Sequence, residues 1–222
     1  MARRPDPGAR ERILEVASRL FVEHGVHAVG LQQIIDECGC GKNLLYREFR
    51  NKDDLVVAFL ERCRADWAGI VDRAVRSVPG PAEQIVAIVG AVAEQATADG
   101  FRGCPLRNVY VEFPDPDHPA HRAIVAHYTG RRAALRELAH RARASDPDAL
   151  AGRICLIIDG INTSAPVLRD KAAVDAAVLF AEETVSSATS ATSATSATSA
   201  TSVTSVTSVT QAHDDPVGAT GR

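Results

Sequence analysis

The sequence predicts an all-α protein, with a unit of short helices followed by a larger helical domain. Three observations support this fold class. Apolar residues recur at helical spacing along most of the chain, segments rich in glycine or proline separate these stretches, and patterns typical of strands are nearly absent. With 222 residues, of which 45% are hydrophobic, the chain is long enough for one or two globular domains.

Short helices are expected within residues 10–64. A first helix has one apolar face, formed by Ile13, Leu14, Ala17, Leu20 and Phe21. Gly25 follows this face and suits the end of a helix, where a positive φ is common. A second helix is expected over residues 31–38, a third over 42–49, and a fourth from near Asp53.

Longer amphipathic helices are expected within residues 65–186. Their apolar positions mark segments at 85–92, 103–113, 124–138, 147–165 and 170–186. Pro166 is expected to stop the fourth of these, because proline lacks the amide hydrogen that continues a helix.

Both ends of the chain differ in composition from these domains. Residues 1–9 carry Arg3 and Arg4 beside two prolines, and we expect a flexible basic arm. Residues 187–222 begin with five Ser-Ala-Thr and three Ser-Val-Thr triplets. A period of three matches neither a helix face nor a strand face and offers no large side chain to bury. We therefore expect a low-complexity, disordered tail.

The cysteines and the N-terminus indicate a cytoplasmic protein. The chain has an odd number of cysteines at irregular spacings: Cys38, Cys40, Cys63, Cys104 and Cys155. The first residues, MARRPDPGARER, lack the apolar stretch of a secretory signal, and no run reaches the roughly 18 apolar residues of a membrane span. We therefore expect a reducing compartment, no membrane contact and no disulfide framework.

The most specific segment is GVHAVGLQQIIDECGCGKNLLYREFRNKDDL, residues 25–55. The helix over residues 31–38 is followed by a tight turn at residues 39–41. A short helix comes next, and its Leu45 and Phe49 are expected to face the core. Two short helices that cross about a glycine turn are typical of a helix-turn-helix, whose second helix enters the major groove of DNA.

This segment resembles the helix-turn-helix of the TetR family of bacterial regulators. The positions that match the family pattern, without a gap, are Gly25, Ile34, Gly39, Leu45, Tyr46, Phe49, Lys52, Asp53, Asp54 and Leu55. Four positions depart from it. Ile35 and Cys38 replace alanines, Cys40 replaces valine, and Gly41 replaces the Ser or Thr that caps the recognition helix. A glycine cap is weaker than a serine cap by about a few tenths of a kcal/mol.

DNA contacts are expected on the second helix of this unit. Lys42, Asn43 and Arg47 are the candidates for base edges, because arginine suits guanine and asparagine suits adenine. The resemblance implies that Tyr46 and Lys52 contact phosphates. We also assign to this DNA surface the residues Gln32, Gln33 and Leu44.

The charge distribution agrees with a local DNA contact. Residues 1–52 contain nine Lys or Arg and seven Asp or Glu, whereas the whole chain has a formal net charge of -3. Modest positive charge therefore lies in the segment expected to meet double-stranded DNA, and negative charge lies in the rest.

The TetR resemblance implies that the larger domain holds both a dimer interface and a ligand pocket. The helices expected over residues 147–165 and 170–186 are rich in Ile and Ala. With the same two helices of a second copy they could form a four-helix bundle. A homodimer would place two recognition helices roughly 34 Å apart on a near-palindromic operator.

Candidate pocket residues for a small-molecule effector are Trp67, Cys104, Tyr110, Phe113 and Tyr128, although each is also a common core residue. The segment RGCPLRNVYVEF, residues 102–113, resembles a signature of one TetR subgroup with a Gly-Cys-Pro segment. Some relatives with a cysteine there respond to oxidants or electrophiles, which would make Cys104 a sensor. Otherwise Cys104 is a small apolar residue near a helix start.

No metal, cofactor or catalytic site is expected. His118, His121 and His127 lie near one helix start beside Pro and Asp residues, where a helix-capping turn fits better than a metal site. The spacing of Cys38 and Cys40 does not fit a zinc knuckle. The sequence shows no nucleophile elbow and no phosphate-binding glycine loop, so we do not expect an enzyme.

These observations favour a sequence-specific, DNA-binding transcriptional regulator, with repression that a small-molecule ligand relieves. Two alternatives stay open. The same regulator could instead respond to oxidants or electrophiles through Cys104. The chain could also be a helical interaction module without DNA binding, because Gly41 lacks the usual capping hydroxyl.

Overall fold

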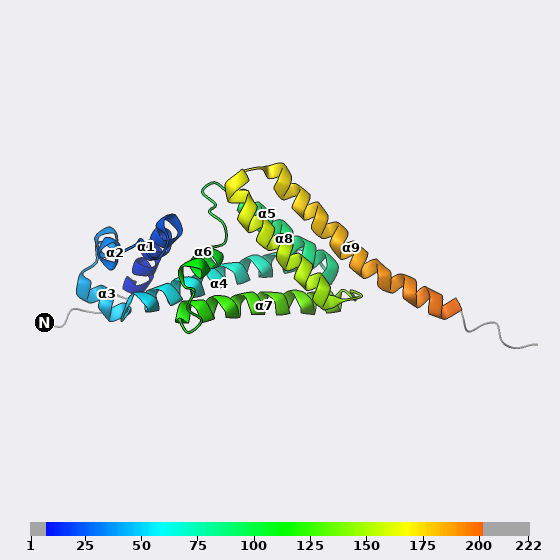
Figure 1. Ribbon diagram of the computed structural model, residues 1–222, viewed down its shortest axis with the longest axis horizontal. Coiled ribbons are helices and arrows are strands. Elements are labelled where there is room, and N and C mark those ends of the chain that lie inside the picture. Colours follow the sequence, from blue (N-terminus) through cyan, green and yellow to red (C-terminus); the bar gives the residue numbers. More distant parts are fainter. Residues whose placement is uncertain (1–7, 202–222) are drawn as a thin grey trace, which may run out of the picture.

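The structure is a computed structural model that describes residues 8–201, with side chains to residue 190. Within that part of the chain every regular element is a helix, so the predicted all-α class is confirmed. The elements are α1 (Ala9–His24), α2 (Leu31–Cys38), α3 (Lys42–Glu48), α4 (Lys52–Ser77), α5 (Pro81–Ala96), α6 (Pro105–Glu112), α7 (Pro119–Arg141), α8 (Pro147–Leu168) and α9 (Lys171–Thr201). Figure 1 shows α1–α3 at one end of the molecule and α5, α8 and α9 towards the other.

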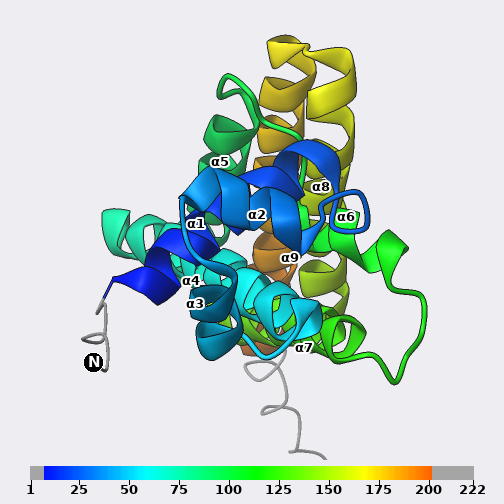
Figure 2. The same ribbon diagram turned by 90° about the vertical axis from the view of Figure 1, so that its left-hand side faces the viewer.

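The N-terminal unit matches its prediction closely. α2 has the bounds expected from the sequence, and α3 begins at Lys42. Leu45 and Phe49 are buried together with Phe21 of α1 and Phe59 of α4, and the rings of Phe21 and Phe59 meet edge to face at 5.5 Å. Apolar burial therefore fixes α1, α2 and α3 around the first turns of α4, as Figure 2 shows from the N-terminal end.

α4 crosses the boundary that we expected between residues 64 and 65. It continues for 26 residues, from Lys52 to Ser77. Asn51 caps its start, because its side-chain oxygen accepts the N–H of Asp54 at 2.7 Å. The N-terminal unit and the larger domain therefore share one uninterrupted helix, which lies beside α7 in Figure 1.

Packing divides the molecule differently from the sequence. The first apolar core, around α1–α3, also contains Leu106 and Val109 of α6, Phe113 directly after α6, and Ala120 and Ile124 at the start of α7. The second core joins the remainder of α4 and α7 with α5, α8 and α9. α6 and the start of α7 therefore belong to the core of the N-terminal unit, although the chain enters them after α5.

Proline has two different roles in these helices. The first residues of α5 to α8 are Pro81, Pro105, Pro119 and Pro147, at a position where the missing N–H is not needed. Pro166 lies inside α8, which ends two residues later at Leu168, close to the end expected near Pro166. Its missing N–H leaves the carbonyl of Asn162 without a helical donor. Gly103, with φ +85°, approaches that carbonyl so closely that a Cβ would lie 2.8 Å from the oxygen.

The C-terminal tail also departs from its prediction. α9 runs to Thr201, so residues 187–201, which we expected to be disordered, continue the helix. Alanine, which each of these triplets contains, has the highest helix propensity of all residues. Ala188 also packs against the second core, and its carbonyl accepts the N–H of Ser145 at 3.0 Å. Local propensity and tertiary packing together outweigh the lack of an apolar face.

Two predictions fall on other parts of the chain. Residues 1–7, which include Arg3 and Arg4 of the expected basic arm, and residues 202–222 of the expected tail lie outside the described residues. Over residues 8–201, the helices are too short or too polar for any of them to span a membrane.

Candidate nucleic-acid interface and effector cavity

The turn between α2 and α3 is built around Gly39. Its backbone has φ +61°, in the left-handed region that glycine adopts readily. The N–H of Gly39 donates to the carbonyl of Asp36 at 3.4 Å, and the N–H of Cys40 donates to the carbonyl of Ile35 at 3.2 Å. These two backbone hydrogen bonds end α2 in a Schellman motif and redirect the chain into α3.

α3 presents the exposed residues that the sequence predicted. Leu45 is fully buried, whereas Lys42, Asn43, Tyr46 and Arg47 are exposed. The ammonium group of Lys42 lies 6.0 Å from the centre of the Tyr46 ring. An ammonium, an amide, a phenol and a guanidinium therefore share one short helix. These are the groups that contact base edges and phosphates in protein–DNA complexes.

The remaining residues predicted on α2 and α3 are less available. Leu44 is half-buried. On α2, the side-chain amide of Gln32 donates to Asp36 at 2.8 Å, and that of Gln33 donates to Glu37 at 3.4 Å. To contact DNA, both amides would have to break their hydrogen bond to a carboxylate of α2 and donate to a phosphate instead.

Two of the predicted cations already have electrostatic partners. The guanidinium of Arg47 bonds to the carboxylate of Glu48 at 2.9 Å. Lys52, the first residue of α4, is half-buried. Desolvation lowers its pKa, and this effect is stronger than that of the nearby carboxylates of Glu112 and Asp53, which raise it. Lys52 is therefore less available to a phosphate than the exposed cations of α3.

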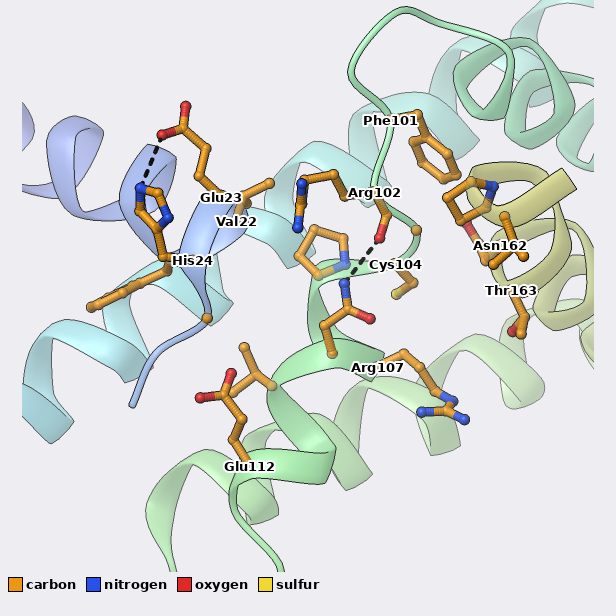
Figure 3. A pocket seen from close by; sticks show the side chains of 18 of the residues that line it. Val22, Glu23, His24, Phe101, Arg102, Cys104, Arg107, Glu112, Asn162 and Thr163 are labelled. Carbon is orange, nitrogen blue, oxygen red and sulfur yellow. Dashed lines mark hydrogen bonds and ion pairs between the residues drawn. The ribbon is translucent and has the colours of Figure 1, made fainter. Parts of the chain in front are cut away.

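Glu112 joins α6 to the N-terminal unit. Its carboxylate accepts the backbone N–H of Val26 at 2.9 Å and that of His27 at 2.7 Å, in the loop between α1 and α2. Figure 3 shows Glu112 at the end of α6, facing the end of α1. A movement of α6 would therefore reach the loop that precedes α2. The sequence around Glu112 does not indicate this contact, because its backbone partners are more than eighty positions away.

A cleft of about 580 Å³ opens between the end of α1 and α8 (Figure 3). α1 contributes Val22 and Glu23 to one wall, and α8 contributes Asn162 and Thr163 to the other. Cys104, just before α6, lies between these walls. The cleft therefore separates the N-terminal unit from α8, and its contents would affect the position of α6.

A second cavity of about 210 Å³ shares Cys104 with the cleft and has walls from α4, α5, α6, α7 and α8. Two of the candidate pocket residues, Trp67 and Cys104, line it. Tyr110 is instead 42% exposed and packs on His121, with the ring centres 5.0 Å apart. Phe113 is buried in the first core. The structure therefore does not bring Tyr110 and Phe113 to this cavity.

Arg131, the buried cation of an ion pair, forms part of the cavity wall. The Arg131 side chain, 4% exposed, bonds to the carboxylate of Asp159 at 2.8 and 2.9 Å. Burial lowers the pKa of Arg131, whereas the charge and hydrogen bonds of Asp159 raise it. The effect of Asp159 is the stronger one, so the pKa of Arg131 is raised. The guanidinium also lies 4.6 Å from the ring centre of Tyr128, a predicted pocket residue that is half-buried behind it. Among the described residues, the buried Nε of Arg131 has no acceptor.

His127 lies beside this ion pair. It is buried, and its ring meets that of Trp67 edge to face at 6.1 Å. Burial, together with the positive charge of Arg131, lowers the pKa of His127 to about 4, so the ring is neutral at pH 7. A groove of about 720 Å³ between α4 and α7 shares Trp67, His127 and Arg131 with the cavity. These three side chains form the wall between cavity and groove.

The structure corrects the expectation that no disulfide forms. Cys38 and Cys40 are joined by a disulfide in the turn between α2 and α3. The positive φ of Gly39 folds the chain back and brings the two Cα atoms to 5.3 Å. Burial raises the pKa of the Cys63 thiol to about 12 and also raises that of Cys155, so both thiols are protonated at pH 7.

The histidine-rich segment before α7 forms the predicted capping turn. Nδ1 of His118 accepts the N–H of Ala120 at 3.2 Å. Nδ1 of His121 lies 2.9 Å from the carbonyl oxygen of Phe113. Across residues 8–201 we find no group of three His, Cys, Asp or Glu side chains placed to hold a metal ion.

Two known families match this chain. The family of bacterial regulatory proteins called the tetR family matches residues 13–59, which cover the N-terminal unit. The tetracyclin repressor-like C-terminal domain matches residues 81–180, which include α5 to α8.

Individual relatives agree with these matches. The HTH-type transcriptional activator FasR of Mycolicibacterium smegmatis is 32% identical over 114 residues, which are 50% of this chain and 52% of FasR. The HTH-type transcriptional regulator YxaF of Bacillus subtilis, described as uncharacterized, is 32% identical over 100 residues, which are 44% of this chain and 52% of YxaF. The chain thus matches about half the length of these two curated relatives.

Solved structures show the same fold over nearly their whole length. SCO4454, a TetR-family transcriptional regulator from Streptomyces coelicolor, superposes with a TM-score of 0.78 at 30% identity, over 82% of this chain and 96% of that chain. The reduced form of E. coli NemR superposes with a TM-score of 0.71 at 21% identity, over 79% and 95% of the two chains. Two solved structures thus share the arrangement of helices described above.

Proposed function

This chain belongs to the TetR family of transcriptional regulators, and we propose that it represses genes by binding a near-palindromic operator in double-stranded DNA as a homodimer. A small-molecule effector, bound beside α6, would release it. The protein would act in the cytoplasm, because the operator lies there. The observation that carries the proposal is the exposed set of Lys42, Asn43, Tyr46 and Arg47 on α3.

Fluorescence anisotropy on the DNA upstream of the protein's own gene tests the DNA contact. Arg47→Ala removes one bidentate base contact from each half-site of the homodimer, so it should weaken binding by about thirtyfold or more. Lys42→Ala removes one cation from each half-site, so it should weaken binding and reduce the slope of log affinity against log salt by about two. Lys171→Ala, which removes an exposed cation of α9, is the control. Equal affinity of the unmodified protein for its upstream region and for random DNA would refute the proposal.

We place the dimer interface on α8 and α9, which expose large apolar side chains. Leu156 on α8 is 73% exposed, and Leu179 and Phe180 on α9 are each 58% exposed. Leu156 lies one turn from both Gly152 and Gly160, where an added Cβ would meet no atom within 4 Å. A helix of a second copy could therefore approach this face closely, and a two-fold axis would form a four-helix bundle.

Light scattering in solution tests this interface. Phe180→Glu should convert dimers into monomers, because it would bury a charge without a partner. Operator affinity should fall with it, because a single recognition helix rarely binds a specific site tightly. Val111→Glu, at a 64% exposed position of α6, is the matched control and should stay dimeric. A Phe180→Glu protein that remains dimeric would place the interface elsewhere.

The effector is proposed to be an apolar molecule with one hydrogen-bond acceptor. The 210 Å³ cavity is smaller than typical ligand pockets of roughly 300–1,000 Å³, so an ordinary ligand would extend between Trp67 and Arg131 into the groove. The unpaired Nε of Arg131 favours an oxygen acceptor such as that of a carboxylate, an ester or a ketone.

Trp67 provides the assay for this effector, because it is the one tryptophan of the chain and lines both spaces. Hydrophobic carboxylates, esters and ketones should change its fluorescence and release the operator, whereas hydrocarbons of equal size should bind more weakly. Compounds that change Trp67 fluorescence without any effect on DNA binding would show that the cavity does not control the operator.

Cys104 supports the second candidate function, a response to electrophiles or oxidants. It is the residue before α6 and lines both the cleft and the cavity, so an adduct on its sulfur would displace α6 as a bound ligand would. N-ethylmaleimide should then release the operator from the unmodified protein but not from a Cys104→Ser variant. The same response in both proteins would exclude Cys104 as the sensor.

A further inference from the structure

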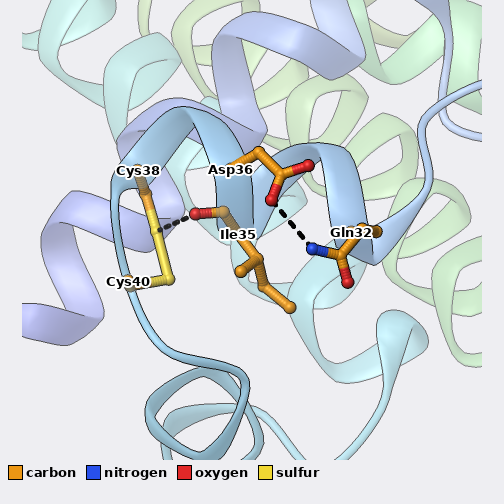
Figure 4. Close-up of a disulfide and its surroundings, with 5 residues drawn as sticks. All are labelled: Gln32, Ile35, Asp36, Cys38 and Cys40. Atoms are coloured by element: carbon orange, nitrogen blue, oxygen red, sulfur yellow. Dashed lines mark hydrogen bonds between the residues drawn. A yellow bond between two sulfur atoms is a disulfide. The ribbon is translucent and has the colours of Figure 1, made fainter.

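The cysteine pair at the turn of the helix-turn-helix has no role in the function proposed so far. Cys38 is the last residue of α2, and Cys40 lies two residues before the first residue of α3. Figure 4 shows their disulfide across the turn, beside the carbonyl of Ile35. The segment that sets the angle between the two helices is therefore also the one that carries the disulfide.

Both sulfur atoms can be reached and yet are held in place. The two side chains are half-buried and pack against the first core, while Gly39 between them and Gly41 after them are exposed. Their Cα atoms are 5.3 Å apart, within the range of ordinary disulfides. The Schellman hydrogen bonds of Gly39 and Cys40 position the pair without help from the sulfur atoms. The reduced turn should therefore keep the thiols close enough to reoxidise.

We propose that Cys38 and Cys40 form a thiol oxidation site that couples redox state to operator affinity, with the disulfide form binding DNA more tightly. This inference rests on the proposed DNA-binding function. It concerns a different pair of sulfur atoms, and a different part of the fold, from the proposed response of Cys104.

The direction of the effect follows from how little else holds the start of α3. This helix has seven residues, and its N-cap, Gly41, makes no side-chain hydrogen bond to it. Sγ of Cys38 lies 3.6 Å from the carbonyl oxygen of Ile35, which also accepts the N–H of Cys40. In the reduced protein the Cys38 thiol becomes a second donor to that carbonyl, at the hydrogen bond that closes the turn.

Reduction removes the covalent link across this turn and should therefore loosen it, and DNA binding would then have to order the turn again. The loop closed by the disulfide contains three residues, for which chain entropy gives an effect on the order of tenfold at most. We expect a reduced protein that still binds the operator, with an affinity lower by a factor of a few to ten.

A small-molecule disulfide is the class of oxidant required. The thiolate of one cysteine attacks a sulfur of that disulfide, which forms a mixed disulfide and releases one thiolate of the small molecule. The second cysteine, as a thiolate, then attacks the protein sulfur of the mixed disulfide and releases the other thiolate. The protein loses two electrons and two protons, and one small-molecule disulfide becomes two small-molecule thiols.

A metal is a poorer occupant of this site. Two thiolates supply half of a tetrahedral zinc site, and the described residues contain no third His, Cys, Asp or Glu grouped with them as a ligand. The other cysteines are less suited to exchange, because burial keeps the thiols of Cys63 and Cys155 protonated.

The test compares the operator affinity of the full chain after incubation with oxidised glutathione and after incubation with dithiothreitol. Alkylation under denaturing conditions should count three thiols in the oxidised protein and five in the reduced one, because the chain has five cysteines. Peptide mapping should place the disulfide at Cys38 and Cys40. The oxidised form should bind the operator several-fold more tightly, and amide exchange of residues 38–42 should be slower in it.

Two variants assign the effect to this pair. Cys38→Ala/Cys40→Val replaces both sulfur atoms with apolar groups that fit the same half-buried sites, and its affinity should not change with oxidation. Circular dichroism confirms that this variant is folded. The triple variant Cys63→Ser/Cys104→Ser/Cys155→Ser keeps the pair and should still respond.

Several results would overturn the proposal. These are an affinity that is equal in both states, tighter binding by the reduced form, a response that persists in Cys38→Ala/Cys40→Val, and a response that disappears in the triple variant. If neither state prefers the operator over random DNA, the DNA-binding function itself fails, and the coupling fails with it. Because the redox comparison itself uses the unmodified chain, loss of folding in a variant cannot hide an equal affinity in both states or tighter binding by the reduced form.

Discussion

Replacing Glu112 with alanine tests whether α6 controls the loop in front of α2. The carboxylate accepts two backbone hydrogen bonds, from Val26 and His27, and no other side chain is recorded as an acceptor for these amides in the described part of the chain. A hydrogen bond to a charged group contributes about 1.5–3 kcal/mol when it is well buried. Glu112 is only half-buried, so we take about 1 kcal/mol for each bond and about 2 kcal/mol for the pair.

Hydrogen exchange measured by mass spectrometry on peptides that cover residues 25–29 reads this change directly. A loss of about 2 kcal/mol corresponds to about 30-fold faster exchange in this loop. Glu112→Gln keeps one oxygen acceptor but loses the charge, so its effect should be intermediate. Glu137→Ala, which removes an exposed carboxylate of α7, should leave the loop unchanged.

The same variants test how an effector signal leaves the larger domain. If α6 transmits the signal through Glu112, an effector identified by Trp67 fluorescence should still bind Glu112→Ala but release less operator DNA. Exchange in the loop at the unmodified rate in Glu112→Ala would refute the structural reasoning. An unchanged effector response, with faster exchange, would show that the signal takes another route.

Three further predictions concern stability. Gly103→Ala should lower the melting temperature more than Gly100→Ala, because both positions have positive φ but only the new Cβ at residue 103 meets a carbonyl, at 2.8 Å; equal shifts would contradict the close contact. Asp159→Asn leaves the buried guanidinium of Arg131 without its anion, so it should lower the free energy of unfolding in urea by about 3 kcal/mol. The control is Asp175→Asn, in the exposed pair with Lys171, which should change this free energy by less than about 1 kcal/mol. The folded pKa of His127, about 4, lies below its unfolded value of 6.5, so its contribution to stability is complete above pH 6.5 and declines as the pH falls towards 4. His127→Gln should remove that part of the pH dependence, and unfolding curves that keep the same dependence would assign it to another group.

Local signals were enough to predict the helix-turn-helix. The bounds of α2 follow from its apolar period and from Gly39, and α3 starts after Gly41 as expected. Its inward residues, Leu45 and Phe49, are buried as predicted. These features depend on neighbours within a few positions, which a single sequence displays.

The placement of the candidate pocket residues depends on contacts between distant parts of the chain, and the structure separates these residues. Trp67 and Cys104 line the cavity, but Tyr110 faces outward and Phe113 lies in the first core. α6 packs its apolar residues into the core of α1–α3 rather than towards α5. The order of the helices does not indicate against which of the two cores α6 packs. The sequence therefore could not show whether an aromatic residue of α6 faces a core, the cavity or solvent.

The unpredicted ionic and covalent contacts have a common cause. Arg131 and Asp159 are 28 positions apart, on neighbouring helices whose rotation decides whether they meet. The disulfide of Cys38 and Cys40 depends on the positive φ of one glycine rather than on the number of residues between the cysteines. Composition and spacing alone therefore could not show either contact.

The unbroken course of α4 has a thermodynamic consequence. Lys52 at its start adjoins the recognition helix, and Trp67, fifteen residues and about 22 Å further on, lines the effector cavity. Because one continuous helix connects the two sites, a rotation of α4 that suits the proposed effector would also change the placement of α3. The coupling must then be reciprocal, so operator DNA should weaken effector binding by the same factor by which the effector weakens operator binding. The DNA-bound regulator would thus have a lower affinity for its effector than the free regulator has.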